Sequence, residues 1–299
     1  MTAPPTWPRC SFVAEAAGDP LEGTAPPADR WFAVEHPGPW GRVPLTQSGI
    51  DRAAVAALGT WASAANGRVV LVRRPGRADA SGTRRWFRVD SRPGHESVST
   101  GTFADESELV TAVHAPGEPY GGPLFLVCTH GGHDTCCAVR GRPVAAALAG
   151  ADPAATWETS HVGGCRFAPA VVLLPHGYVL GRVPAARAPA VADAYREGVI
   201  EPRYVRGRSA LPPAVQAAQH HARAATGALG VDALRLVHSA REEQPGDVVG
   251  WQIELAEPEC SVMLRERTVP AGRPLTCAAT KPGRTRVFDL VKIRTAARG

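Results

Sequence analysis

The chain has 299 residues and a formal net charge of +5, from 33 basic and 28 acidic side chains. Hydrophobic residues make up 44% of it and charged residues 20%. This composition is typical of globular proteins and excludes a chain that is disordered throughout. At about 150 residues per domain, the length predicts two or three domains.

Neither a membrane span nor an export signal is visible in the sequence. The longest apolar runs, such as residues 168–175, are far shorter than the roughly 20 residues that a spanning helix needs. Residues 1–18 contain prolines where a secretory signal would have its apolar core, so we expect a cytoplasmic protein. The basic residues are scattered arginines without a nucleic-acid-binding motif, so we expect neither nucleic acid nor membrane as a partner.

Residues 1–117 are predicted to form an N-terminal α/β unit that begins with a surface loop over 1–27. An amphipathic helix over 51–65 has Asp51 or Ser48 available as its N-cap. The other expected elements are strands at 30–35, 68–73, 85–89 and 96–100 and a short helix at 106–113.

Residues 118–209 follow the order strand, loop, helix, strand, loop, strand, strand, helix. This order predicts a thioredoxin-like layer of helices on a mixed sheet. The expected elements are strands at 124–127, 156–159, 171–174 and 178–183, with helices at 139–149 and 189–197. Residues 210–299 are predicted to add a helix over 214–226 and a small antiparallel sheet with strands at 231–238, 248–255, 261–265, 275–278 and 286–292. The fold class is therefore α/β.

The distribution of the seven cysteines points to a metal site. An odd number of cysteines in a long chain without a visible export signal argues against a disulfide framework. Cys128 and Cys137 flank a glycine-containing loop, and His161 and Cys165 are four residues apart. Both pairs follow predicted strands, so both loops would emerge at one end of the sheet. Thiolates and imidazoles are the ligands of zinc and of iron–sulfur centres.

The spacing bears on which metal is bound. Structural zinc is usually held by pairs two to four residues apart. The gap between Cys128 and Cys137 is wider and suits a larger object, such as a two-iron cluster, although spacing alone leaves both metals open.

Several segments together resemble the sucrase/ferredoxin-like family of thioredoxin-like [2Fe–2S] proteins. The resemblance is sharpest from residue 128 to 183 and weaker over the rest of the chain. The segments that resemble the family are Cys128-Thr-His-Gly-Gly-His-Asp-Thr-Cys-Cys137, Trp157-Glu-Thr-Ser-His161-Val-Gly-Gly-Cys165-Arg-Phe-Ala, Leu174-Pro-His-Gly, Arg206-Gly-Arg-Ser, Leu211-Pro-Pro and Gly38-Pro-Trp-Gly41.

The resemblance implies that one [2Fe–2S] cluster is bound by Cys128, Cys137, His161 and Cys165. Some relatives have histidine where this chain has Cys165, and Pro169 follows Ala168 where the family pattern has asparagine. A ligand set of three thiolates and one imidazole implies an electron carrier or a redox sensor with an unidentified redox protein as partner. Its potential is expected above the roughly −400 mV of plant-type ferredoxins.

Other thiols and imidazoles near this motif have simpler interpretations. Cys136 adjoins Cys137 and is interpreted as a buried or spare thiol, while His130 and His133 are interpreted as solvated or supporting residues. Cys10, Cys260 and Cys277 have no partner at metal-binding spacing and are expected to be small buried apolar side chains.

Two other classes of protein remain alternatives. The same four residues would suit a structural zinc site in an interaction protein. A thiol oxidoreductase is the second alternative, although the chain lacks a Cys-x-x-Cys motif. Whether the protein is an enzyme is left open, and we expect a non-enzymatic carrier.

Overall fold

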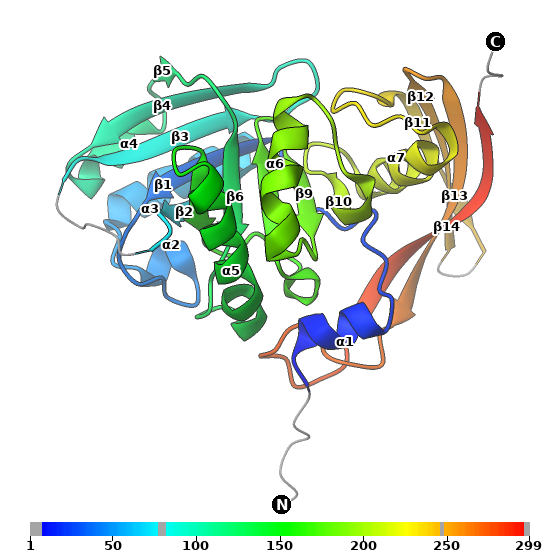
Figure 1. Ribbon diagram of the computed structural model, residues 1–299, viewed down its shortest axis with the longest axis horizontal. Helices are drawn as coiled ribbons and strands as arrows, with labels where there is room; N and C mark the ends of the chain where they lie inside the picture. The colour runs from blue at the N-terminus through cyan, green and yellow to red at the C-terminus, as the bar shows by residue number, and fades with distance from the viewer. Residues whose placement is uncertain (1–7, 77–81, 246–247, 296–299) are drawn as a thin grey trace, which may run out of the picture.

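The computed structural model describes residues 8–76, 82–245 and 248–295. It is a mixed α/β structure with one large mixed sheet, flanking helices and a separate four-stranded antiparallel sheet near the C-terminus (Figure 1). The predicted fold class is therefore confirmed. Within the described ranges, none of the helices combines the length and the apolar character that crossing a membrane requires.

The large sheet has ten strands in the order β10-β9-β8-β6-β7-β2-β1-β3-β4-β5. Only the pairs β1–β2 and β6–β7 are parallel, and the other neighbours are antiparallel. The bounds are β1 Arg30–Glu35, β2 Gly67–Arg73, β3 Arg84–Asp90, β4 Ser97–Phe103, β5 Glu118–Pro119, β6 Leu124–Cys128, β7 Thr156–Thr159, β8 Ala170–Leu174, β9 Tyr178–Gly181 and β10 Val205–Arg208.

Helices and short 3-10 turns connect these strands. Their bounds are α1 Cys10–Ala16, α2 Pro44–Gln47, α3 Arg52–Ala64, η1 Glu106–Glu108, α4 Leu109–Ala112, α5 Thr135–Ala151, η2 Cys165–Phe167, η3 Ala185–Arg187, α6 Ala188–Arg196, η4 Pro202–Tyr204 and α7 Pro213–Thr226. Helix α3 begins where the sequence predicts, because the Asp51 side chain accepts hydrogen bonds from the backbone N–H groups of Ala53 and Ala54.

The central part of the chain has the order expected of a thioredoxin-like domain. Strands β6 and β7 are parallel and joined by α5, and the hairpin β8–β9 and helix α6 follow. Every residue of β6 is buried, as its apolar sequence predicts. Phe125 and Val127 face α5 and α6, whereas Leu126 and Cys128 face the opposite side of the sheet.

The N-terminal unit repeats this order, although no internal repeat is visible in the sequence. Strands β1 and β2 are parallel and joined by α3, and β3, β4 and α4 follow. The sheet order β2-β1-β3-β4 thus matches β7-β6-β8-β9. The two halves meet where β2 pairs antiparallel with β7, so one continuous sheet runs through both.

Four local expectations are wrong. The strand expected at 231–238 instead runs from Arg235 to Gln244 as β11. Residues 10–16 form α1 within the segment expected to be loop, and residues 275–278 lie in a loop instead of a strand. Helix α5 begins at Thr135, four residues before the predicted start, because Asp134 caps it by accepting the backbone N–H of Cys136.

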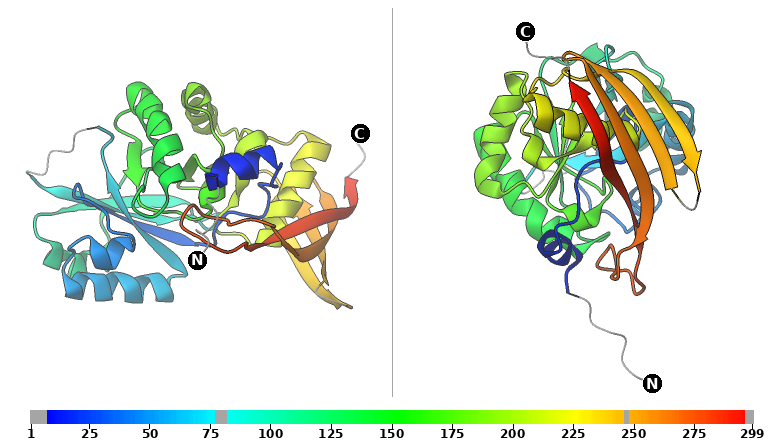
Figure 2. Two further views of the ribbon diagram at one scale, coloured as in Figure 1. Left: turned by 90° about the horizontal axis from the view of Figure 1, so that it is seen from below. Right: turned by 90° about the vertical axis from the view of Figure 1, so that its right-hand side faces the viewer.

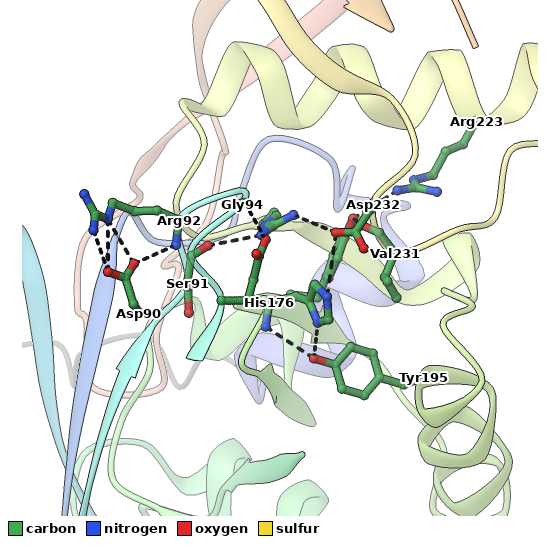
Figure 3. A network of polar contacts seen from close by, with 12 residues as sticks. Asp90, Ser91, Arg92, Gly94, His176, Tyr195, Arg223, Val231 and Asp232 are labelled. Atoms are coloured by element: carbon green, nitrogen blue, oxygen red, sulfur yellow. Dashed lines mark hydrogen bonds and ion pairs between the residues drawn. The ribbon is translucent and has the colours of Figure 1, made fainter. Parts of the chain in front are cut away.

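The C-terminal sheet has the order β11-β12-β13-β14 and packs against α7 (Figures 1 and 2). Its bounds are β11 Arg235–Gln244, β12 Val248–Ala256, β13 Cys260–Pro270 and β14 Arg284–Thr295. A polar network joins the C-terminal part of the chain, through Asp232, to the turn between β8 and β9 (Figure 3). There the His176 ring lies 2.6 Å from the Tyr195 hydroxyl and 3.7 Å from an Asp232 carboxylate oxygen.

Candidate metal centre

The loop between β6 and α5 positions Cys128 and Cys137. Cys128 is the last residue of β6, and Cys137 lies in the first turn of α5. Helix and strand approach closely because Gly141 has no side chain: a Cβ there would lie 2.1 Å from the Cys128 carbonyl oxygen. The predicted pair of thiols is thus held by a strand end and a helix start that pack directly on one another.

The loop after β7 brings in His161 and Cys165. The ends of β6 and β7 are adjacent, because Cys128 is paired in register with Thr159. Gly163 and Gly164 have positive φ values of 96° and 77°, which favour glycine and turn the chain back toward the first loop. Cys165 Sγ then lies 3.6 Å from His161 Nδ1.

The four predicted side chains come together at this edge of the sheet. The ligand atoms of Cys128, Cys137 and His161 all lie within 4.8 Å of one another. The Sγ atom of Cys165 also lies within 4.8 Å of a ring nitrogen of His161 and of the Sγ atom of Cys137. The three cysteines are buried, and His161 is partly exposed. A compact set of three sulfur atoms and one imidazole matches the donor preference of zinc and iron–sulfur centres.

The three thiols compete for protons. Hydrogen bonds with Cys137 lower the pKa of both Cys128 and Cys165, and the same contacts raise the pKa of Cys137. Three adjacent buried thiolates would repel one another, so full ionisation needs a cation. This chemistry fits a site that binds a metal centre.

His161 responds to the same thiols. Burial alone would lower its pKa, but hydrogen bonds with Cys128 and Cys165 outweigh that effect and raise the pKa to about 9. An imidazole with a raised pKa must lose its proton before it can ligate a metal.

Two further histidines adjoin the site, and sequence spacing alone gave no reason to include them. The His133 ring stacks on the His161 ring, with centroids 3.7 Å apart and planes inclined by 16°. His130 is buried, and its Nδ1 accepts a hydrogen bond from the backbone N–H of His161 at 3.3 Å. His130 thus supports the second loop, whereas His133 places another nitrogen donor near His161 and Cys165.

The Gly38–Gly41 segment, one of those that resemble the family, packs against this site. The Trp40 indole N–H donates to the His36 carbonyl at 3.1 Å, which fixes the ring. The Trp40 and His130 rings then meet edge to face, with centroids 5.8 Å apart. The His133 Nδ1–H donates to the Arg42 carbonyl oxygen at 3.3 Å.

Two arginines place positive charge beside the thiols. Arg206 is 1% exposed and donates to the Gly163 carbonyl oxygen at 2.9 Å. Burial, reinforced by the charges of Arg166 and Arg68, lowers the pKa of Arg206 to about 9. Arg68 donates to the His161 carbonyl oxygen at 3.4 Å, and burial lowers its pKa while Cys128 opposes that shift. The sequence indicates Arg206 only as part of a segment that resembles the family, and tertiary packing places it against the loop that carries His161 and Cys165.

The remaining cysteines divide into two groups. Cys260 is buried in β13, as expected for a small apolar side chain. Cys277 is exposed, so that expectation is wrong for it. Cys10 and Cys277 also have thiol neighbours, because their Sγ atoms lie 3.6 Å apart and Cys136 Sγ lies 3.3 Å from Cys277 Sγ.

The fold and the site together define a mixed α/β protein with a cysteine- and histidine-rich group that can hold a metal. The family model for sucrase/ferredoxin-like proteins matches residues 21–207. The chain therefore belongs to the sucrase/ferredoxin-like family, as the sequence motifs predict. No curated protein and no solved structure shows a significant match to this chain.

Proposed function

We propose that this protein is an electron carrier that holds one [2Fe–2S] cluster through Cys128, Cys137, His161 and Cys165. The observation that supports this proposal is the meeting of three thiols and one imidazole from two loops at one edge of the sheet. A bound [2Fe–2S] cluster would supply one-electron redox chemistry. The protein residues would bind it, balance its charge and limit its contact with water.

The charge balance around the site favours a potential above that of four-cysteine ferredoxins. A neutral imidazole in place of one thiolate removes one negative charge, so addition of an electron costs less. Arg206 and Arg68 add positive charge next to the loop that carries His161 and Cys165. Both effects favour the reduced state.

Access for a redox partner is best on the side of the histidines. His133 and His161 are partly exposed, and the loop residues Gly131 and Gly132 are exposed. The three cysteines lie behind them and are buried. We propose that a redox protein docks over this loop, because the distance to the cluster would be shortest there.

Anaerobic purification tests the proposal directly. We expect a red-brown protein with about two irons and two acid-labile sulfides per chain, and an EPR signal on reduction. Cys137→Ser should lose the colour and most of the iron. Cys260→Ser, which replaces another buried cysteine in the distant strand β13, is the matched control and should keep both.

A structural zinc site would give the opposite result. If the purified protein contained zinc at these four residues without iron or sulfide, and the zinc left in Cys137→Ser, the electron-transfer proposal would be wrong.

A further inference from the structure

A second group of thiols lies beside the proposed cluster site. It consists of Cys10 in the first turn of α1, Cys136 in the first turn of α5 and Cys277 in the loop between β13 and β14. Asp134, the N-cap of α5, completes the group. Figures 1 and 2 show α1 and the loop between β13 and β14 side by side, at the lower edge of the molecule in Figure 1. The four ligand atoms all lie within 4.8 Å of one another.

Cys136 and Cys137 are adjacent in sequence but belong to different groups. Cys137 lies with Cys128 and His161, whereas Cys136 Sγ lies 3.3 Å from Cys277 Sγ. Successive helical residues point in different directions, so one helix turn supplies a thiol to each group. The thiol of Cys136 is therefore available to a second site.

Asp134 is held in a fixed orientation within the group. One carboxylate oxygen accepts the Cys136 backbone N–H and the other accepts the Cys277 backbone N–H, both at 2.8 Å. Cys10 Sγ lies 3.7 Å and 3.8 Å from these two oxygens. Asp134 is 2% exposed. A buried carboxylate with its rotamer fixed by two N–H donors, beside three thiols, is a preorganised set of ligands for a metal.

We propose that Cys10, Cys136, Cys277 and Asp134 form a second metal site, which binds a single zinc ion with structural effect. With Zn–S bonds of about 2.3 Å and a Zn–O bond of about 2.0 Å, tetrahedral geometry places neighbouring sulfurs about 3.8 Å apart and sulfur and oxygen about 3.5 Å apart. The observed S–S separations of 3.3 and 3.6 Å and S–O separations of 3.7 and 3.8 Å are close to these ligand-to-ligand distances. The ion enters from the side of Cys277, the exposed member of the group.

A disulfide would be the other chemistry open to these thiols. It joins two sulfurs at about 2.0 Å and leaves a third one unused. Here Cys277 has two thiol neighbours at similar distances, and a carboxylate faces the same point. Three thiols and one carboxylate match the coordination number of zinc, so the arrangement favours a metal over a disulfide.

The zinc ion would join three parts of the chain that are distant in sequence. Cys10 and Cys277 are 267 residues apart, and Cys136 and Cys277 are 141 residues apart. Because the ligands come together only in the folded chain, zinc binding would stabilise the fold and hold α1 and the loop between β13 and β14 against α5.

Metal analysis of paired variants tests this proposal separately from the iron proposal. For wild-type protein produced with iron and zinc in the medium, we expect about one zinc per chain in addition to iron. Cys277→Ser should lower the zinc content at least tenfold and leave the iron content unchanged. Cys137→Ser should show the reverse pattern, and the control Cys260→Ser should keep both metals.

A second measurement uses the wild-type protein and does not depend on the folding of a variant. Thiol alkylation followed by mass spectrometry should label Cys10, Cys136 and Cys277 only after a chelator removes the zinc. A wild-type protein without zinc, or with a disulfide between two of these cysteines, would overturn the proposal. So would zinc that stays in Cys277→Ser, or chelator-independent alkylation of all three thiols.

Discussion

The close packing of α5 on β6 makes Gly141 the most informative single position near the site. Replacement by alanine places a Cβ 2.1 Å from the Cys128 carbonyl oxygen and 3.1 Å from its carbonyl carbon. Both atoms belong to the backbone of a fully buried strand, so no flexible side chain can move aside. Relief requires α5 to move away from β6, which separates Cys137 from Cys128.

The expected cost follows from two opposing terms. Overpacking in a buried interface costs about 1–3 kcal/mol, whereas the better helix propensity of alanine returns about 1 kcal/mol. Because the contact involves two rigid backbones, we expect the upper end of the range and a net loss of about 2 kcal/mol in the free energy of unfolding. Chemical denaturation measures this loss, and metal analysis of the same samples should show reduced iron.

Gly150→Ala is the matched control. Gly150 lies near the end of the same helix, and a Cβ there meets nothing within 4 Å. This variant should therefore be as stable as wild type or more stable by up to about 1 kcal/mol, with unchanged iron. If Gly141→Ala were as stable as Gly150→Ala and kept its full iron content, the argument that this close approach positions the site would be refuted.

Three other predictions address charge, pH and local structure. His161→Cys should lower the reduction potential, on the order of 100 mV, because it restores a fourth thiolate; an unchanged potential in protein-film voltammetry would argue against ligation by His161. Burial would raise the pKa of the Glu96 carboxyl, but hydrogen bonds from the backbone and from Arg208 outweigh this effect and lower the pKa. The Glu96 carboxylate therefore contributes stability above its unfolded pKa of about 4.3, and this stability is lost as the pH falls toward the folded pKa. Arg208→Met leaves this partly buried carboxylate without its cation, so thermal unfolding should show a loss of about 3 kcal/mol at pH 7 that shrinks by pH 4; a loss independent of pH would contradict the assignment. Asp51→Ala removes the N-cap of α3 and should cost about 1 kcal/mol, whereas Asp51→Asn should cost less; equal losses in urea denaturation would mean that the cap hydrogen bonds are not the cause.

Elements with a strong local signal were predictable from the sequence. The apolar run of β6 and the Asp51 cap of α3 lie where their patterns indicate, because an unbroken apolar run and a capping side chain are features of residues close in sequence. The residues of the proposed cluster site were also identifiable, because both pairs directly follow predicted strands and lie in segments that resemble the family. The start of α5 differs from the prediction because the sequence of Asp134 and the following cysteines is equally typical of a metal-binding loop.

Only the tertiary structure decided which distant segments meet. The antiparallel pairing of β2 with β7, which joins two halves of the same topology into one sheet, leaves no local pattern in either strand. The same holds for the meeting of Cys10, Cys136 and Cys277 and for the burial of Arg206 below the site. Caps, periodicity and spacing depend on interactions between residues close in sequence, whereas contacts across 141 or 267 residues depend on how whole helices and sheets pack.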